Sequence, residues 1–346
     1  MTINHTEILI MLESHNPNTK LSAVIERSQE LIRQIMDLQN PGETKDLITI
    51  ARDFEELVKL NEDELGDRYL TRVKQQYPDF YIRLNEEYGL DVIMRLNNRK
   101  TIREFPPGMK SLKIDDCENL EIIAELPSGL KEFVVNECPN LAIIAEFPAG
   151  LERLEINSCY NLSHIPEFPP GLEELEIVNC ENIETIREFP PGLKVSYIEY
   201  CSNLESIVEL PSGLKVFVVN ECPNLASMPE FPRDLEKLAI LNCLSLEIVP
   251  DLPSSLERLA ILNCYKIGTL PEFPLDLESL NINECPNLAI IAEFPPGLER
   301  LEIKSCYKLS HIPKFPSSLK EFHIEHCPNL TQETLDRIEE FNKKQS

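Results

Sequence analysis

The chain has 346 residues, of which 33 are Lys or Arg and 59 are Asp or Glu, and its formal net charge is −26. A polyanion of this strength repels phosphate backbones and anionic lipids, which argues against nucleic acid and membrane surfaces as partners. The first residues have no basic start and only a short apolar run, so we expect neither a cleaved signal peptide nor a membrane span. The negative charge either serves solubility or favours a partner with a basic surface.

The amino-terminal part of the chain lacks the repeat that fills the rest. Its apolar spacing predicts helices near 3–13, 19–39, 44–61 and 63–76, followed by a helical pair near 79–98. We therefore predict an all-α domain over residues 1–101. Two interpretations of this domain stand side by side. It is either a cap that shields the first repeat, as solenoids require, or a separate targeting or binding module, because about 100 residues reach the size of a domain.

Cysteines define a repeat in the remaining sequence. All eleven lie between Cys117 and Cys327, and they follow one another at a constant interval of 21 positions. With few exceptions, apolar residues recur five and three positions before each cysteine and three and six positions after it. Pro recurs ten positions after every cysteine that a further copy follows. A fixed period of roughly 20 to 50 residues indicates a solenoid, which here has eleven units over residues 102–330.

The repeat is built to stack. Its consensus, L-x-x-L-x-I-x-x-C-x-x-L-x-x-I-x-x-F-P-x-x, begins with an alternation of apolar and polar positions that is typical of a half-buried strand. A single unit of this length cannot bury its apolar column alone, whereas neighbours that pair their strands in parallel share one core. We predict an α/β solenoid with a parallel inner sheet on its concave side.

Proline and glycine predict the course of the return segment. The recurring Pro argues against a helix there, because it lacks an N–H donor and blocks helical geometry, so we expect extended or polyproline backbone on the convex side. Gly follows the Pro by two positions in many copies, for example at Gly150, Gly192, Gly213 and Gly297. We expect this glycine to occupy a backbone position with positive φ.

The cysteine side chains are expected to point into the core. On stacked parallel strands their Cβ atoms lie somewhat beyond the usual reach of a disulfide. One thiol per repeat also does not offer the clustered ligands of a zinc site. We predict buried, reduced thiols that pack as small apolar groups and imply a reducing compartment.

The middle repeats carry apolar residues where the other repeats are polar. Positions four and two residues before each cysteine point out of the inner sheet, and in most copies they are polar, as at Glu155 and Asn157. The apolar residues at and beside these positions are Val195, Tyr197, Tyr200, Val216, Val218, Ala239, Leu241, Ala260 and Leu262. Scattered surface apolar residues carry no meaning, but adjacency on successive strands favours a protein-binding site. Ser196 replaces a core Leu or Phe in this region and is expected to loosen its repeat.

The last residues, 331–346, predict a short capping helix. Thr331 can cap a helix that runs through Asn342. Leu335, Ile338 and Phe341 would then cover the last repeat, because a solenoid needs its terminal core shielded.

Motifs of catalysis and cofactor binding are not found in the sequence. There is no Gly-rich phosphate loop and no nucleophile elbow, so we expect no enzyme, no catalytic residue, no cofactor and no metal. His323 and His326 lie beside Glu321 and Glu325 on the last predicted strand, where a metal site and an exposed polar rim are the two alternatives.

The repeat resembles the leucine-rich repeat in its Cys form, L-x-x-L-x-L-x-x-N/C-x-L. Its short unit and its Pro-x-x-Leu sequence, as in EFPAGLERLEINSCYNLSHIPEFP at 146–169, are most similar to bacterial leucine-rich-repeat effectors of type III and type IV secretion. The ubiquitin-ligase domain that often follows the repeats in this family has no counterpart in this sequence.

This resemblance implies a leucine-rich-repeat horseshoe that works as a protein–protein interaction module. It further implies a monomeric effector that leaves the bacterial cytoplasm for the host cytoplasm and binds a host protein on its concave face. Two alternatives are an ordinary intracellular scaffold and an unrecognised enzymatic activity in the amino-terminal domain.

Overall fold

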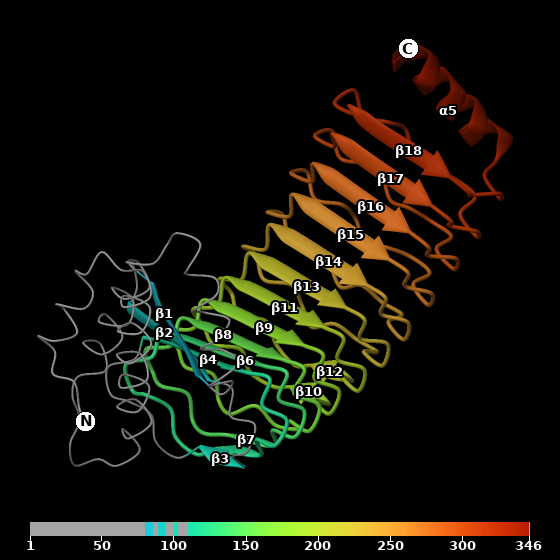
Figure 1. The fold of residues 1–346 in the computed structure, drawn as a ribbon. Helices are drawn as coiled ribbons and strands as arrows, with labels where there is room; N and C mark the ends of the chain where they lie inside the picture. The colour runs from blue at the N-terminus through green and yellow to red at the C-terminus, as the bar shows by residue number, and fades with distance from the viewer. Residues whose placement is uncertain (1–79, 86–88, 95–99, 103–109, 346) are drawn as a thin grey trace, which may run out of the picture. The chain divides into compact units, whose positions relative to one another are not determined.

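The computed structural model of the chain describes residues 80–85, 89–94, 100–102 and 110–345 (Figure 1). The chain divides into two compact units, Met1–Leu151 and Glu152–Ser346. The four helices predicted between residues 3 and 76 lie outside the described residues. Among the described residues, no helix has both the length and the apolar character that a membrane crossing requires.

The described part of the first unit begins with a β-hairpin where the sequence predicted a helical pair near 79–98, and that prediction is wrong. Strands β1 (Phe80–Asn85) and β2 (Gly89–Met94) pair antiparallel, with Ile82 opposite Val92. The segment alternates apolar with other residues at a period of two and is rich in aromatic and β-branched residues, which favours strand over helix. Strand β2 also pairs in parallel with the first repeat, so neighbouring backbone supplies the hydrogen bonds that a helix would have made internally.

Two repeats follow in the same unit. Strands β4 (Ser111–Asp115) and β6 (Glu132–Asn136) pair in parallel, and each residue of β4 lies beside its equivalent in the next repeat. A second, small parallel sheet joins β3 (Thr101–Ile102), β5 (Ile122–Ile123) and β7 (Ile143–Ile144) on the return segments. The core of this unit therefore lies between two parallel layers that come from the same repeats.

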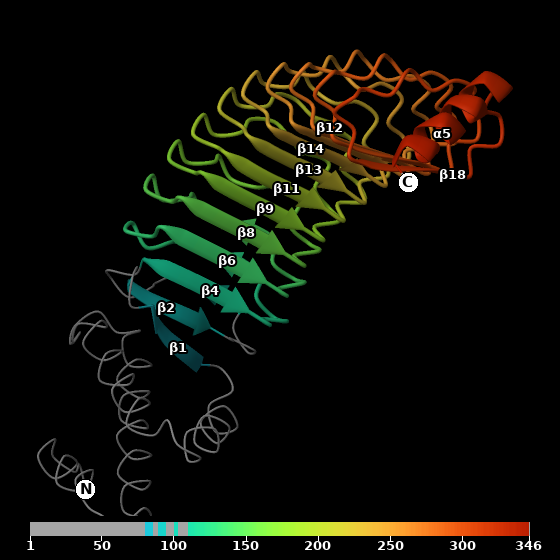
Figure 2. The same cartoon turned by 90° about the horizontal axis from the view of Figure 1, so that it is seen from above.

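The second unit is a stack of parallel strands, as predicted (Figure 2). Each strand pairs with the strand of the next repeat at an offset of exactly one repeat unit, and the register does not slip. The strands are β8 (Arg153–Asn157), β9 (Glu174–Val178), β11 (Val195–Glu199), β13 (Val216–Asn220), β14 (Lys237–Leu241), β15 (Arg258–Leu262), β16 (Ser279–Asn283), β17 (Arg300–Lys304) and β18 (Glu321–Glu325).

Alternation along each strand separates the core from the exposed face. In β14, Leu238 and Ile240 are buried, whereas Lys237 is exposed and Ala239 and Leu241 are half-buried. The same alternation recurs in β15 and β17, so one continuous apolar core runs through the repeats. A column of phenylalanine rings supports this core on the return side, for example between Phe273 and Phe294, whose ring centroids are 6.4 Å apart.

Two tight turns shape each return segment. The backbone N–H of Leu225 donates to the Cys222 carbonyl at 3.2 Å, and that of Leu235 donates to the Pro232 carbonyl at 3.2 Å. Between these turns the described return segments contain no helix, as the prolines predicted. Strands β10 (Thr185–Ile186) and β12 (Ser206–Ile207) even pair in parallel there, which the sequence had not indicated.

Positive φ lies at a different residue from the predicted one. The residue before each cysteine adopts it, from Asp116 at 56° to His326 at 54°. Gly150, Gly192, Gly213 and Gly297 have no positive φ, so the prediction for these glycines is wrong. At Gly192 the reason for glycine is space, because an added Cβ would lie 2.9 Å from the Pro170 carbonyl oxygen of the preceding repeat.

All eleven cysteines lie in the described part of the chain and are buried thiols, as predicted. The Sγ of Cys264 donates to the Leu262 carbonyl at 3.3 Å and lies 3.5 Å from the Ile240 carbonyl of the preceding repeat. Burial raises the pKa of the Cys243 thiol to about 12 and that of Cys285 to about 11. These thiols are therefore neutral packing groups near neutral pH.

Helix α5 (Gln332–Gln345) closes the stack, as the sequence predicted in outline. The Thr331 hydroxyl accepts a hydrogen bond from the Thr334 backbone N–H at 3.4 Å, which caps the helix. The Phe341 ring packs 5.0 Å from Phe315, and Ile338 is half-buried. Leu335 is 41% exposed, so its predicted place over the last repeat is wrong; the inward position belongs to Thr334.

Candidate protein-binding surface

The structure places four predicted site residues side by side on the exposed face of the second unit. Tyr197 is the register partner of Val218, Val218 of Ala239, and Ala239 of Ala260. These residues come from β11, β13, β14 and β15, which are successive strands spaced by about 4.8 Å. They form one row across the strands, because the repeat register brings equivalent residues of successive repeats together.

Two further rows lie on either side of this one. Leu241 and Leu262 are register partners on β14 and β15, two residues further along their strands. Val195 and Val216 are partners on β11 and β13, two residues earlier. We call these eight residues the apolar patch: Val195, Tyr197, Val216, Val218, Ala239, Leu241, Ala260 and Leu262.

All residues of the apolar patch are accessible. Tyr197 is 36% exposed, and the other seven are half-buried. Tyr200, the ninth predicted residue, is 49% exposed but lies past the end of β11, where its backbone N–H donates to the Asn220 carbonyl at 2.9 Å. Tyr200 therefore borders the patch and does not belong to its rows.

Carboxylates border the patch on its amino-terminal side. Glu176 on β9 is the register partner of Tyr197, and Glu155 on β8 is the partner of Glu176. Arg153 pairs with Glu174 at 3.1 Å and with Glu155 at 3.4 Å. Glu176 makes no ion pair with any described residue. Partial burial, followed by the nearby Glu155 carboxylate, raises the pKa of Glu176 above its ordinary value despite Arg153. This border therefore carries more negative charge than its one arginine neutralises.

Two cations border the patch at the first residues of β14 and β15. Lys237 is the register partner of Val216, and Arg258 is the partner of Lys237. Both side chains belong to exposed residues, and neither makes an ion pair with a residue that the structure describes. The exposed face thus passes from acidic on β9, through apolar on β11 and β13, to apolar with basic neighbours on β14 and β15.

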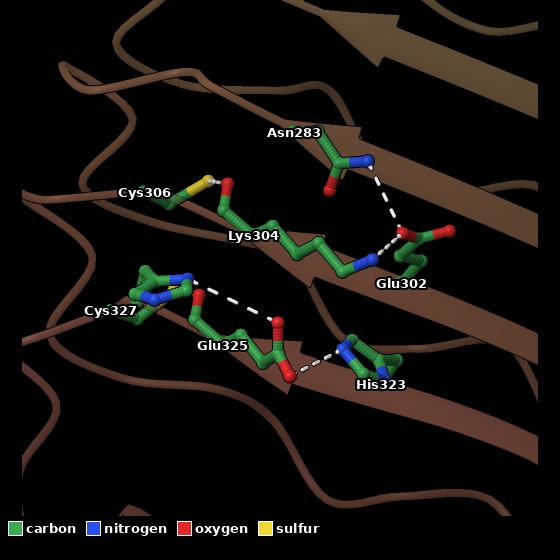
Figure 3. Close-up of polar contacts among 8 residues, drawn as sticks. Asn283, Glu302, Lys304, Cys306, His323, Glu325 and Cys327 are labelled. Carbon is green, nitrogen blue, oxygen red and sulfur yellow. Dashed lines mark hydrogen bonds and ion pairs between the residues drawn. The ribbon is translucent and has the colours of Figure 1, made fainter.

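On the last strands, several charged side chains pair with one another (Figure 3). Lys304 contacts Glu302 on β17, and the Asn283 amide donates to Glu302 at 3.4 Å. His323 Nε2 lies 2.9 Å from Glu325 Oε1 on β18. These contacts lower the pKa of Glu302, through Lys304, and of Glu325, through His323. Paired charges attract a partner less strongly than Glu176, Lys237 and Arg258, which make no ion pair with the described residues.

The predicted alternative of a metal site on the last strand can be compared with this geometry. No group of three or more His, Cys, Asp or Glu among the described residues is arranged to hold a metal ion. His323 and His326 both approach Glu325, at 2.9 Å and 4.0 Å. These three side chains lie on the exposed edge of the last strand.

Ser196 lies in the core beneath the patch, where its neighbours in the register are Leu175 and Phe217. It is fully buried, and its hydroxyl has no hydrogen-bond partner in the described part of the chain. An unsatisfied buried hydroxyl costs about 1–3 kcal/mol, so we expect this strand to contribute less to stability than its neighbours. The sequence signal for it was the break in the apolar column.

Sequence reasoning missed the ionic borders of the patch. Glu176, Lys237 and Arg258 occupy positions that are polar in most repeats, so nothing in the sequence distinguished them. The strand register could have found them. Glu176 pairs with Tyr197 of the patch, Lys237 pairs with Val216 of the patch, and Arg258 pairs with Lys237. Whether a charged side chain has an internal partner depends on its distance from the nearest opposite charge, on its own strand or on a neighbouring one.

Comparisons with known proteins give one kind of likeness. No family model matches the chain, and no curated protein matches it. Two solved structures are similar to this chain. One is YopM from Yersinia enterocolitica WA-314, at 18% identity and a TM-score of 0.28, and the match covers 88% of this chain and 81% of that one. The other is YopM described as a leucine-rich effector protein from Yersinia pestis, at 20% identity and a TM-score of 0.30, and the match covers 86% of this chain and 99% of that one.

The chain resembles bacterial leucine-rich-repeat effectors. That resemblance lies in the repeat sequence itself, and the parallel solenoid is the fold which it implies. Because both TM-scores are low, we infer nothing about function from either YopM structure.

Proposed function

We propose that this chain is a protein-interaction module which binds a partner protein through the apolar patch on β11, β13, β14 and β15. The observation that carries the proposal is the continuity of the patch, since four successive strands each present an accessible apolar side chain in one row. Contiguous exposed apolar surface with a polar rim is typical of protein interfaces. The aromatic ring of Tyr197 suits the centre of such an interface.

The same proposal extends to the setting in which binding occurs. We propose a monomeric effector that acts in the host cytoplasm on a host protein, on the face that the repeat pattern predicts to be concave. The support is the resemblance of the repeat to bacterial effectors and the column of buried thiols, which suits a reducing compartment. A translocation assay with a reporter fusion, together with light scattering for the oligomeric state, tests this setting.

The binding proposal is tested by two aspartates in the patch. Leu241→Asp with Leu262→Asp changes half-buried side chains of the exposed face, so folding is expected to persist. Capture of the partner from a reducing host-cell lysate should fall by at least about tenfold, because two apolar contacts are replaced by charges. Leu244→Asp with Leu275→Asp is the matched control, since these leucines are 38% and 71% exposed and lie outside the patch.

A photo-crosslinking residue at Tyr197 sharpens the test. It should crosslink to the partner that the patch captures, whereas the same residue at Tyr307, which is 52% exposed and distant in the repeat order, should not. Capture that survives unchanged in the Leu241→Asp, Leu262→Asp variant contradicts the proposal.

A further inference from the structure

We infer that the apolar patch takes an amphipathic helix of the partner, which lies across the strands with basic residues over β9, apolar residues over the patch and acidic residues over the starts of β14 and β15. This inference rests on the proposed function and adds the chemistry of the partner. Three observations carry it: the strand spacing, the extent of the apolar rows, and the charges of Glu176, Lys237 and Arg258, which make no ion pair with the described residues.

Spacing favours a helix over an extended segment. The rows of the patch run across the strands, and successive strands lie about 4.8 Å apart. A helix rises about 5.4 Å per turn, so one turn lies over each strand and the side chains of one face meet one row. In an extended segment, side chains on one face are about 6.7 Å apart, which falls out of step with the strands after two residues.

The length of the footprint follows from its charged ends. From Glu176 on β9 to Arg258 on β15 there are five neighbouring strands and therefore four strand spacings. Four spacings amount to about 19 Å, which a helix of about 13 residues spans. The recognition element is thus a helix of three to four turns, a length that is common in globular proteins and in peptide ligands.

Charge complementarity sets the order of the side chains on that helix. Glu176 and Glu174 are the register partners of Tyr197 and Val195, with Arg153 as the local cation, so the helix end over β9 is expected to carry Lys or Arg. Lys237 and Arg258 make no ion pair with the described residues, so the other end is expected to carry Asp or Glu on the flank that faces them. A chain of net charge −26 would otherwise favour partners that are basic throughout.

Side-chain size indicates where the helix approaches most closely. Ala239 and Ala260 are register partners in the middle row, and each lies between two longer side chains of its own strand. The backbone of the helix can therefore come nearest over β14 and β15. Beyond them, the outward positions of β16 include Asn281 and Asn283, and Glu302 pairs with Lys304 on β17, so the apolar and unpaired surface ends there.

The experiment uses a displayed library of random 16-residue helical peptides as the probe, selected on the full chain in reducing buffer. We expect enriched peptides to share a basic end, an apolar stripe at positions i, i+4, i+7 and i+11, and an acidic end. They should lose binding to the Leu241→Asp, Leu262→Asp variant. Glu174→Lys with Glu176→Lys should weaken them about tenfold or more, and changing their basic residues to Glu should restore binding to that variant.

Glu272→Lys with Glu293→Lys is the matched control, because it makes the same change of charge at exposed residues of the return segments. It should leave the enriched peptides unaffected. No enrichment, enrichment without an order of charge, or equal weakening by both pairs of lysine substitutions overturns the inference.

Failure of the inference is distinguishable from failure of the proposed function. If the leucine variant loses capture of the lysate partner while Glu174→Lys with Glu176→Lys and Lys237→Glu with Arg258→Glu leave it unchanged, the patch binds but the charge-ordered helix is wrong. If instead the Leu241→Asp, Leu262→Asp variant captures the lysate partner normally, the proposed binding function and the inferred helix are both wrong.

Discussion

In the second unit, the inward face of the parallel sheet repeats almost unchanged, whereas the exposed face changes from strand to strand. Ile156, Ile240 and Ile303 hold one buried position in β8, β14 and β17, and each is fully buried. The neighbouring outward position is held by Glu155 in β8 and by Ala239 in β14. Stacking constrains the inward position in every repeat and leaves the outward position free to vary. We therefore expect binding residues on the outward, variable face.

The largest expected effect concerns the inward face at alkaline pH. Burial raises the pKa of Cys243 to about 12 and of Cys285 to about 11, above the value of about 8.5 in an unfolded chain. The unfolded chain therefore loses these protons first, and stability that is fully present below pH of about 8.5 is lost as pH rises towards the folded pKa values. Each such thiol lowers the free energy of unfolding by about 1.4 kcal/mol per pH unit in that window.

Urea unfolding followed by circular dichroism between pH 8 and pH 10.5 measures this loss. Cys243→Ala should remove the contribution of one thiol, about 1.4 kcal/mol per pH unit, from the slope of unfolding free energy against pH. This change in slope is independent of any effect of the substitution on stability at pH 8. An unchanged slope would show that this thiol is not buried as a neutral group.

The second prediction compares the two faces within a single strand. Leu238 is 2% exposed, so Leu238→Ala should lower the free energy of unfolding by about 2–5 kcal/mol through lost burial and a cavity. Leu241, three residues later in β14, is half-buried on the exposed face, and Leu241→Ala should cost less than about 1 kcal/mol. Urea titration of both variants gives the difference, and equal losses would contradict the division into two faces.

The smallest expected effect lies at the boundary between the faces. Glu284 precedes Cys285 with a φ of 53°, a conformation that costs a residue with a Cβ about 1–2 kcal/mol. Glu284→Gly should be neutral or stabilising by up to about 1 kcal/mol, because glycine removes that cost but has more entropy in the unfolded chain. Glu284→Val should destabilise, since β-branched residues tolerate positive φ poorly. Thermal melts of the Glu284→Gly and Glu284→Val variants measure the difference. A Val variant more stable than the Gly variant would contradict the positive φ at residue 284.

Several features of the fold could be predicted because they follow from the period alone. A strict repeat interval in a parallel stack makes each residue the neighbour of its equivalent in the next repeat, so the row from Tyr197 to Ala260 was visible in the sequence. The burial of the cysteines follows from the same reasoning, since one apolar column can be hidden only by its copies. The proline spacing likewise indicated an extended return segment.

Other features depend on contacts between elements, which only the tertiary structure decided. The sequence pattern of β1 and β2 favours strands, but the pairing of β2 with β4 belongs to the tertiary structure, as does the positive φ at the bend before each cysteine. The pairing of charges also belongs to the tertiary structure: Lys304 contacts Glu302 on its own strand, whereas Lys237 forms no ion pair with a described carboxylate. The sequence by itself determined which residues stack, because stacking needs only a period. The tertiary structure decided which charged side chains form ion pairs within the described chain, because an ion pair requires the two charged groups to lie within reach of each other.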